Sequence, residues 1–214
     1  MNAIAVAPAP APVVPLDPRV RRTRQLLREA LVSLLGEKSF EAISVHDLAE
    51  RATVNRVTFY DHYDDKFALL DDLIGESFRE LLQTRLAEQT GEPCCRKFHA
   101  LMLALCDYLG KLIGHCKIHH QPLFGPLVES RVKALLCEQI AAWLREETPC
   151  RLRVSPALGA TLAGWSMYGA ALEWSMGGQP KPAEEFAPEV LGPLAVALFI
   201  ERPDKEQGTA ERTA

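Results

Sequence analysis

The chain has 214 residues, enough for one compact domain or for a small domain joined to a larger one. Hydrophobic residues make up 48% of it and charged residues 24%, which excludes a disordered or fibrous body. The 24 Lys and Arg stand against 28 Asp and Glu, a net charge of -4, which excludes a protein that coats nucleic acid over its whole surface. Any contact with nucleic acid must be local.

The two ends of the chain differ in composition from its body. Residues 1–17 open with MNAIAVAPAPAPVVPL, which lacks the basic region of an export signal and is predicted to form a disordered Ala/Pro-rich arm. Residues 203–214 form a polar tail that we expect to fray. The default compartment without an export signal is the reducing cytoplasm, so we expect no disulfide. The six cysteines show no CxxC spacing: Cys94, Cys95, Cys106, Cys116, Cys137 and Cys150.

The first predicted helix spans residues 18–36 and begins with a cluster of positive charge. Leu27, Leu31 and Leu34 recur at helical spacing. Residues 19–28, RVRRTRQLLR, contain five arginines and no acid. Positive charge at the start of a helix opposes the helix dipole, so the arginines indicate an anion nearby.

Two short helices follow with tight connections. Ser44 and Asp47 form a capping-box pattern for the first, and Asn55 is a favourable cap for the second, over residues 56–63. Asp64 or Asp65 then caps a fourth helix. Two helices separated by a turn of three or four residues form the layout of a helix-turn-helix, which we place within residues 18–66.

The rest of the chain is predicted to be helical, so the fold class is all-α: a three-helix helix-turn-helix domain and a C-terminal helical bundle over residues 67–202. Proline or glycine separates most of the helices. Residues 157–176 imitate a membrane span because Glu173 is their one charge. However, regularly spaced glycines and the lack of a flanking basic cluster favour a soluble helix packed closely on another. The expected helices cover residues 67–89, 92–113, 123–146, 156–176 and 184–200.

The third helix has the side chains that read base pairs. A helix in the major groove needs short or planar polar groups near its start. Arg56, Val57, Thr58 and Tyr60 share the face that we expect to be exposed, while Phe59 points inward. Arg56 suits the O6 and N7 atoms of guanine, and Val57 suits a thymine methyl group.

Phosphate contacts are expected at the end of the same helix. Tyr60, His62 and Lys66 offer aromatic, imidazole and ammonium donors, with Lys66 aided by free N–H groups where the fourth helix starts. Nearby acids, Asp61 among them, weaken binding unless they act as helix caps or orient Arg56.

Residues 48–70, LAERATVNRVTFYDHYDDKFALL, resemble the N-terminal domain of the tetracycline-repressor (TetR) family of bacterial transcription regulators. FEAISVHDL, residues 40–48, also matches the family's pattern, and the likeness covers about residues 18–70. The family usually has glycine where Thr53 and Val57 stand, so we expect a reshaped turn and a less close approach of the backbone to DNA. The recognition-helix signature is matched by Phe59, Tyr60, His62, Tyr63 and Lys66.

The resemblance implies a homodimeric regulator, most often a repressor, on double-stranded DNA. One short reading helix covers too few base pairs, so two are needed on a pseudo-palindromic operator. Residues 157–176 and 184–200 are the candidates for a dimer interface, as a four-helix bundle. The predicted DNA-binding residues are Arg21, Arg22, Arg24, Ser44, His46, Asn55, Arg56, Val57, Thr58, Tyr60, His62 and Lys66.

A small-molecule effector in the C-terminal domain is also implied by the resemblance. It would tilt the fourth helix and change the separation of the two recognition helices. Aromatic and Met side chains at helical spacing are more often core than ligand-binding, so that alternative stays open for each candidate. The candidates are Met102, Cys106, Tyr108, Phe124, Trp143 and Trp165.

Parts of the sequence are also compatible with two other classes of function. The segment HCKIHH places His115, Cys116, His119 and His120 close together, but Gly114 interrupts the helix that would align them, which favours a structural role over metal or redox sensing. A helical protein-interaction module whose helix-turn-helix does not bind DNA is the remaining alternative. No motif of an enzyme is present, and no cofactor is expected.

Overall fold

Helices account for most of the chain that the structure describes. The structure is a computed structural model, which describes residues 17–88, 93–115, 124–146 and 151–200. A 3-10 turn, η1, and two short strands accompany the helices. The elements are α1 (Pro18–Leu35), η1 (Phe40–Ala42), α2 (Val45–Arg51), α3 (Arg56–Tyr60), α4 (Lys66–Glu88), α5 (Pro93–His115), α6 (Phe124–Arg145), β1 (Arg151–Leu152), α7 (Pro156–Met176), α8 (Ala183–Leu198) and β2 (Phe199–Ile200).

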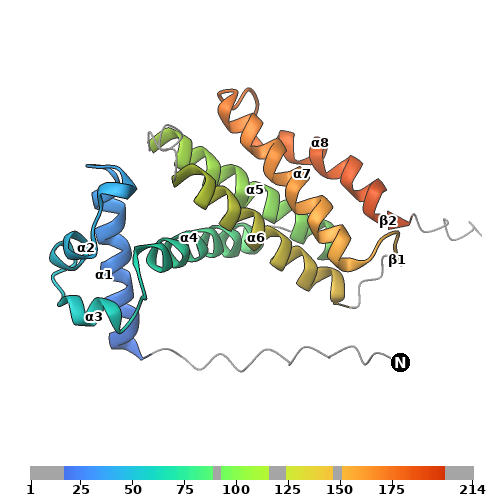
Figure 1. Cartoon of the computed structure of the whole chain (residues 1–214). Helices are drawn as coiled ribbons and strands as arrows, with labels where there is room; N and C mark the ends of the chain where they lie inside the picture. The colour runs from blue at the N-terminus through green and yellow to red at the C-terminus, as the bar shows by residue number, and fades with distance from the viewer. Residues whose placement is uncertain (1–16, 89–92, 116–123, 147–150, 201–214) are drawn as a thin grey trace, which may run out of the picture.

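Helices α1 to α3 form a small unit at one end of the molecule, which we call the reader (Figure 1). Asp17 caps α1, with its carboxylate accepting the Arg19 N–H at 2.8 Å. Each of the three helices contributes at least one fully buried side chain to a shared core, including Leu31, Leu48 and Phe59. Since helices this short are unstable alone, this shared core is what holds them folded.

Helix α4 runs from the reader into the rest of the molecule (Figure 1). It contacts α1 on the reader side and α5 and α6 on the other. Its buried residues belong to one hydrophobic cluster that continues from Leu27 in α1 to Leu198 in α8. Helix α4 therefore joins the packing of the reader to that of the bundle.

Helices α5 and α6 pack against α4, and α7 and α8 pack on α5 and α6, side by side at the edge far from the reader (Figure 1). Helix α7 approaches α6 closely at Gly164, where an added Cβ would lie 2.9 Å from the Cys137 sulfur. Gly159 and Gly164 thus allow close packing, whereas an added Cβ at Gly169 would meet nothing within 4 Å. No helix among the described residues is long and apolar enough to cross a membrane.

The all-α prediction is confirmed, with one local correction at the C-terminal end. The last helix stops at Leu198 instead of Ile200, because Phe199 is extended (φ -111°, ψ 147°). β2 then pairs antiparallel with β1, Leu152 opposite Phe199, and this short pair fastens the end of α8 beside the start of α7. The third helix is also shorter than expected and ends at Tyr60.

Candidate nucleic-acid interface

One face of α3 is left uncovered by the rest of the protein. Asn55 caps the helix by accepting the Val57 N–H at 3.0 Å. Phe59 is fully buried, whereas Val57 is 67% exposed and Tyr60 is 53% exposed. Arg56 is exposed and Thr58 is half-buried. The short helix therefore presents the predicted polar and apolar groups outward, anchored by a single aromatic side chain.

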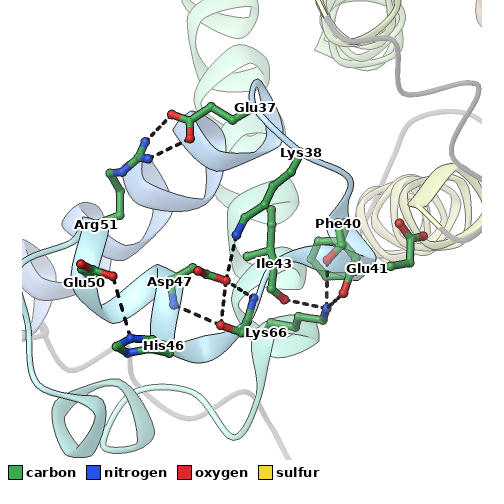
Figure 2. A network of polar contacts seen from close by, with 11 residues as sticks. Glu37, Lys38, Phe40, Glu41, Ile43, His46, Asp47, Glu50, Arg51 and Lys66 are labelled. Atoms are coloured by element: carbon green, nitrogen blue, oxygen red, sulfur yellow. Dashed lines mark hydrogen bonds and ion pairs between the residues drawn. The ribbon is translucent and has the colours of Figure 1, made fainter.

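Helix α2 begins with a local capping box and is held to the segment after α1 by ion pairs (Figure 2). Asp47 accepts hydrogen bonds from the Ser44 hydroxyl at 2.7 Å and the Ser44 N–H at 2.8 Å, and pairs with Lys38 at 2.9 Å. These contacts hold the pKa of Asp47 well below its usual range, with the Ser44 hydroxyl as the largest cause. Arg51 pairs with Glu37 through two hydrogen bonds of 2.7 and 2.9 Å.

Two predicted DNA-binding residues of α2 differ in their freedom. The Ser44 hydroxyl is engaged in the capping box, since it also accepts the Asp47 N–H at 3.2 Å. His46 is exposed, and its Nε2 lies 3.9 Å from Glu50 in an exposed pair (Figure 2). His46 is thus available to a ligand, while Ser44 serves the helix.

The turn between α2 and α3 keeps a left-handed residue despite its threonine. Thr53 has φ 56°, and its N–H donates to the Glu50 carbonyl at 3.1 Å. The expected reshaping of the turn is therefore wrong: Thr53 adopts a backbone conformation that favours glycine. A left-handed conformation costs an L-residue about 1–2 kcal/mol. The turn tolerates this cost because its other hydrogen bonds are made.

Arginines at the start of α1 add positive charge to the reader. Arg19, Arg21 and Arg22 are exposed, and none of the ion pairs formed among the described residues involves them or Arg56. Arg24 instead turns inward, with its guanidinium carbon 5.5 Å from the centre of the Tyr63 ring. Arg19 was missing from the predicted set, although it belongs to the same acid-free stretch of sequence.

Lys66 departs most from expectation. Its ammonium group donates to the carbonyl oxygens of Phe40, Glu41 and Ile43 at 2.9, 3.0 and 2.8 Å (Figure 2). All three of its N–H donors are thus used inside the protein. The lysine closes the η1 turn onto the start of α4, which corrects the expectation of an ammonium free for phosphate.

The N–H groups at the start of α4 are also engaged. Asp65 accepts the Phe67 and Ala68 N–H groups, both at 2.8 Å, so the expected capping acid is Asp65. Asp61 and Asp64 are exposed, and His62 is half-buried. The phosphate contacts predicted for this end of the site therefore reduce to Tyr60 and His62.

The predicted effector residues do not form one site. Tyr108 and Phe124 line a groove of about 520 Å³ between α1, α4, α5 and α6, which we call the junction groove. Met102 and Cys106 are buried in the core, as is Trp143, and none of the three lines this groove. Trp165 is 59% exposed on α7. Sequence reasoning missed the apolar α4 residues of the groove, such as Leu70 and Leu73, because their helical spacing is also that of a core face.

The metal and redox alternatives gain no support from the described part of the chain. No group of three or more His, Cys, Asp or Glu side chains within it is arranged to hold a metal ion. The cluster from His115 to His120 lies outside the described residues, except for the backbone of His115. Burial, and then the nearby Asp107, raises the pKa of the Cys106 thiol to about 12, so it stays protonated and unreactive.

Comparison with known proteins identifies the reader. Residues 27–73, from α1 into α4, match the family model described as bacterial regulatory proteins, tetR family. The reader is therefore similar to the DNA-binding domain of TetR-family regulators. The predominantly helical architecture, with the helix-turn-helix at the N-terminus, agrees with that likeness.

Two curated proteins similar to this chain are transcriptional regulators. The HTH-type transcriptional regulator YxbF of Bacillus subtilis is 38% identical over 68 residues, which are 31% of this chain and only 18% of YxbF. The HTH-type transcriptional repressor DhaR of a Mycobacterium species is 24% identical over 186 residues, covering 80% of this chain and 91% of DhaR. The higher identity is thus concentrated in a short segment.

A solved structure extends the likeness to the whole fold. The TetR-family regulator from Streptomyces coelicolor A3 superposes with a TM-score of 0.59 at 16% identity, covering 85% of this chain and 97% of that one. At this identity the comparison concerns architecture alone. The arrangement of reader, α4 and bundle is therefore shared with a TetR-family protein whose sequence has diverged widely.

Proposed function

We propose that this protein is a cytoplasmic TetR-family repressor that binds a pseudo-palindromic operator as a homodimer and leaves it when a small molecule binds. The observation that carries the proposal is the exposed face of α3 beside unpaired arginines of α1. Without DNA, this arrangement leaves cationic side chains such as Arg21 and Arg56 with no compensating acid in the described ion pairs. A duplex supplies the missing negative charge.

Base recognition falls to the start of α3. Arg56 carries a planar guanidinium that suits the two acceptors of guanine, and Val57 presents methyl groups suited to thymine. Val57 is 67% exposed, so a large apolar surface faces water in the unbound protein. Packing Val57 against the methyl group of thymine removes this surface from water and so favours sites that contain thymine.

The arginines of α1 position the reader on the phosphate backbone. Arg19, Arg21 and Arg22 lie within the first turns of α1 and are exposed. Their attraction to phosphate does not depend on base sequence, so they supply affinity and register, while α3 supplies specificity.

The dimer forms through α7 and α8. Leu158, Leu162 and Trp165 lie three and four residues apart on α7 and are 49%, 44% and 59% exposed, and Val196 on α8 is 61% exposed. Exposed apolar groups at helical spacing form a stripe that another helix covers. In a dimer the stripes of the two copies cover each other, because a two-fold interface is self-complementary.

The effector occupies the junction groove. Its volume of about 520 Å³ lies in the range of small-molecule sites, and its walls include Leu70, Leu112, Phe124 and Val128. An apolar lining of this kind selects a predominantly apolar molecule. Since the groove also includes Val32 of α1, a bound molecule touches both the reader and the bundle.

Selection of binding sequences from a pool of random duplexes tests the proposal. The expected result is a consensus of two inverted half-sites. Arg56→Ala should lower affinity for that consensus by about 1–3 kcal/mol and relax the preference at one position in each half-site. A pool that yields no enriched sequence, at low as well as moderate salt, would leave a protein-docking role for the helix-turn-helix.

A further inference from the structure

Asp72 on α4 holds two separate parts of the reader through a single carboxylate oxygen. Its Oδ2 accepts from Arg28 Nη1 at 2.9 Å and from the Tyr63 hydroxyl at 2.6 Å. Arg28 lies on α1, and Tyr63 follows α3. The Arg28 and Asp72 side chains are 15% and 26% exposed, so water competes weakly for these bonds.

Tyr63 moves with the recognition helix. It is 6% exposed, its N–H donates to the Phe59 carbonyl at 2.9 Å, and its ring centre lies 5.9 Å from that of Phe59. Burial, followed by the hydrogen bond to Asp72, raises the pKa of its hydroxyl. The hydroxyl therefore stays protonated and donates to Asp72 at any physiological pH.

The neighbouring carboxylate, Asp71, ties α4 to the bundle. Its Oδ1 lies 2.8 Å from Arg131 Nε on α6. The Arg131 guanidinium lies close to Gly75, where an added Cβ would be 3.8 Å from Nη2. Two consecutive acids of α4 thus face opposite partners, one in the bundle and one in the reader.

The same turns of α4 line the junction groove. Leu70, Leu73 and Ile74 face the groove and flank the two acids in sequence. A molecule that presses on these leucines displaces the part of α4 that carries Asp71 and Asp72, because well-packed helices shift as units.

We infer that Asp72 is the positioning residue that makes the recognition helix turn with α4, by holding Tyr63 and Arg28 on one oxygen. The inference rests on the proposed function, since it concerns how two readers keep the spacing that an operator requires. Asp72 itself contacts no DNA. Its loss loosens the reader on α4 and leaves the base-reading groups intact.

Half-site spacing gives the test. The selected operator is compared with versions in which one base pair is added or removed between half-sites, which rotates one half-site by about a tenth of a turn. The parent dimer should lose affinity by about 10-fold or more on either change. In Tyr63→Phe and Asp72→Asn we expect this ratio to fall to about threefold or less, mainly through weaker binding at the preferred spacing.

Controls separate positioning from general damage. The variant that combines Tyr63→Phe and Asp72→Asn should show the same affinity ratio as Asp72→Asn alone, because both changes break the same hydrogen bond. Tyr168→Phe, which deletes a buried hydroxyl in α7, should keep the parent ratio. If Asp72→Asn does not fold, Tyr63→Phe, which keeps the ring, decides the outcome. Variants that keep the parent's spacing preference overturn the positioning role alone, whereas a parent with no spacing preference overturns the paired-reader function as well.

Discussion

At the scale of single residues, Lys66 shows how a family signature can serve the fold. Its ammonium bonds to three carbonyl groups around η1. Lys66→Met leaves these acceptors without a partner and should lower the free energy of unfolding by about 2–3 kcal/mol. Thermal or urea unfolding measures the change. Lys181→Met, which removes one exposed ion pair with Glu189, should cost less than about 1 kcal/mol. Equal losses in the two variants would contradict the structural role of Lys66.

At Thr53 we expect a substitution to stabilise the protein, because this residue occupies a conformation suited to glycine. Its φ of 56° costs about 1–2 kcal/mol in an L-residue, while glycine adds about 0.5–1 kcal/mol of unfolded-state entropy. Thr53→Gly should therefore stabilise the protein by up to about 1 kcal/mol, with Thr53→Asn in between. Urea unfolding with an unchanged m-value is the measurement. A loss of stability in the glycine variant would mean that the threonine side chain makes a compensating contact.

At the scale of elements, capping of α2 makes the reader sensitive to acid. The folded-state pKa of Asp47 is depressed by Ser44 and Lys38. A depressed pKa contributes stability that is present above the unfolded value of about 3.9 and is lost as pH falls through the folded value. As the pH drops below about 4, we expect the melting temperature of the parent protein to fall. The fall should be shallower in Asp47→Asn, whereas the exposed control Asp64→Asn should fall as steeply as the parent. Identical pH profiles for all three proteins would exclude Asp47 as a source of acid sensitivity.

The same elements show what the sequence can predict. The start of each reader helix was predictable because Asp17, Ser44 and Asn55 act locally, through N–H groups two or three residues away. The roles of Lys66 and Asp72 were not predictable, because their partners are distant in sequence. The partners of Lys66 lie 23 to 26 residues away, and Arg28 lies 44 residues from Asp72. The end of α8 was missed for the same reason, since β2 depends on pairing with distant β1.

The candidate site divides in a similar way. The exposed face of α3 was predictable because Phe59 alone must be buried to anchor a helix of five residues. The junction groove was not predictable, because it depends on how far α1 lies from α5 and α6 in space. Tyr108 and Trp143 have the same kind of sequence pattern, yet only Tyr108 lines the groove.

At the scale of the whole molecule, two readers can sit on one operator only in a dimer. Leu162→Asp places a charge in the exposed stripe of α7, where Leu162 is 44% exposed. Since the residue is not core, the helical content should stay unchanged while the dimer dissociates. Sedimentation should show a dimer for the parent and a monomer for the variant, with Leu127→Asp on α6 as a matched control. A dimeric Leu162→Asp protein would move the interface elsewhere.

The salt dependence of operator binding tests most directly whether paired readers contact DNA through α3 and the arginines of α1. Four cations per subunit would neutralise about eight phosphates, so log K should fall with log salt concentration at a slope of about -7. Arg21→Gln should lower the magnitude of that slope by about two in the dimer, one phosphate per subunit. A slope near zero, or one that Arg21→Gln leaves unchanged, would contradict the interface.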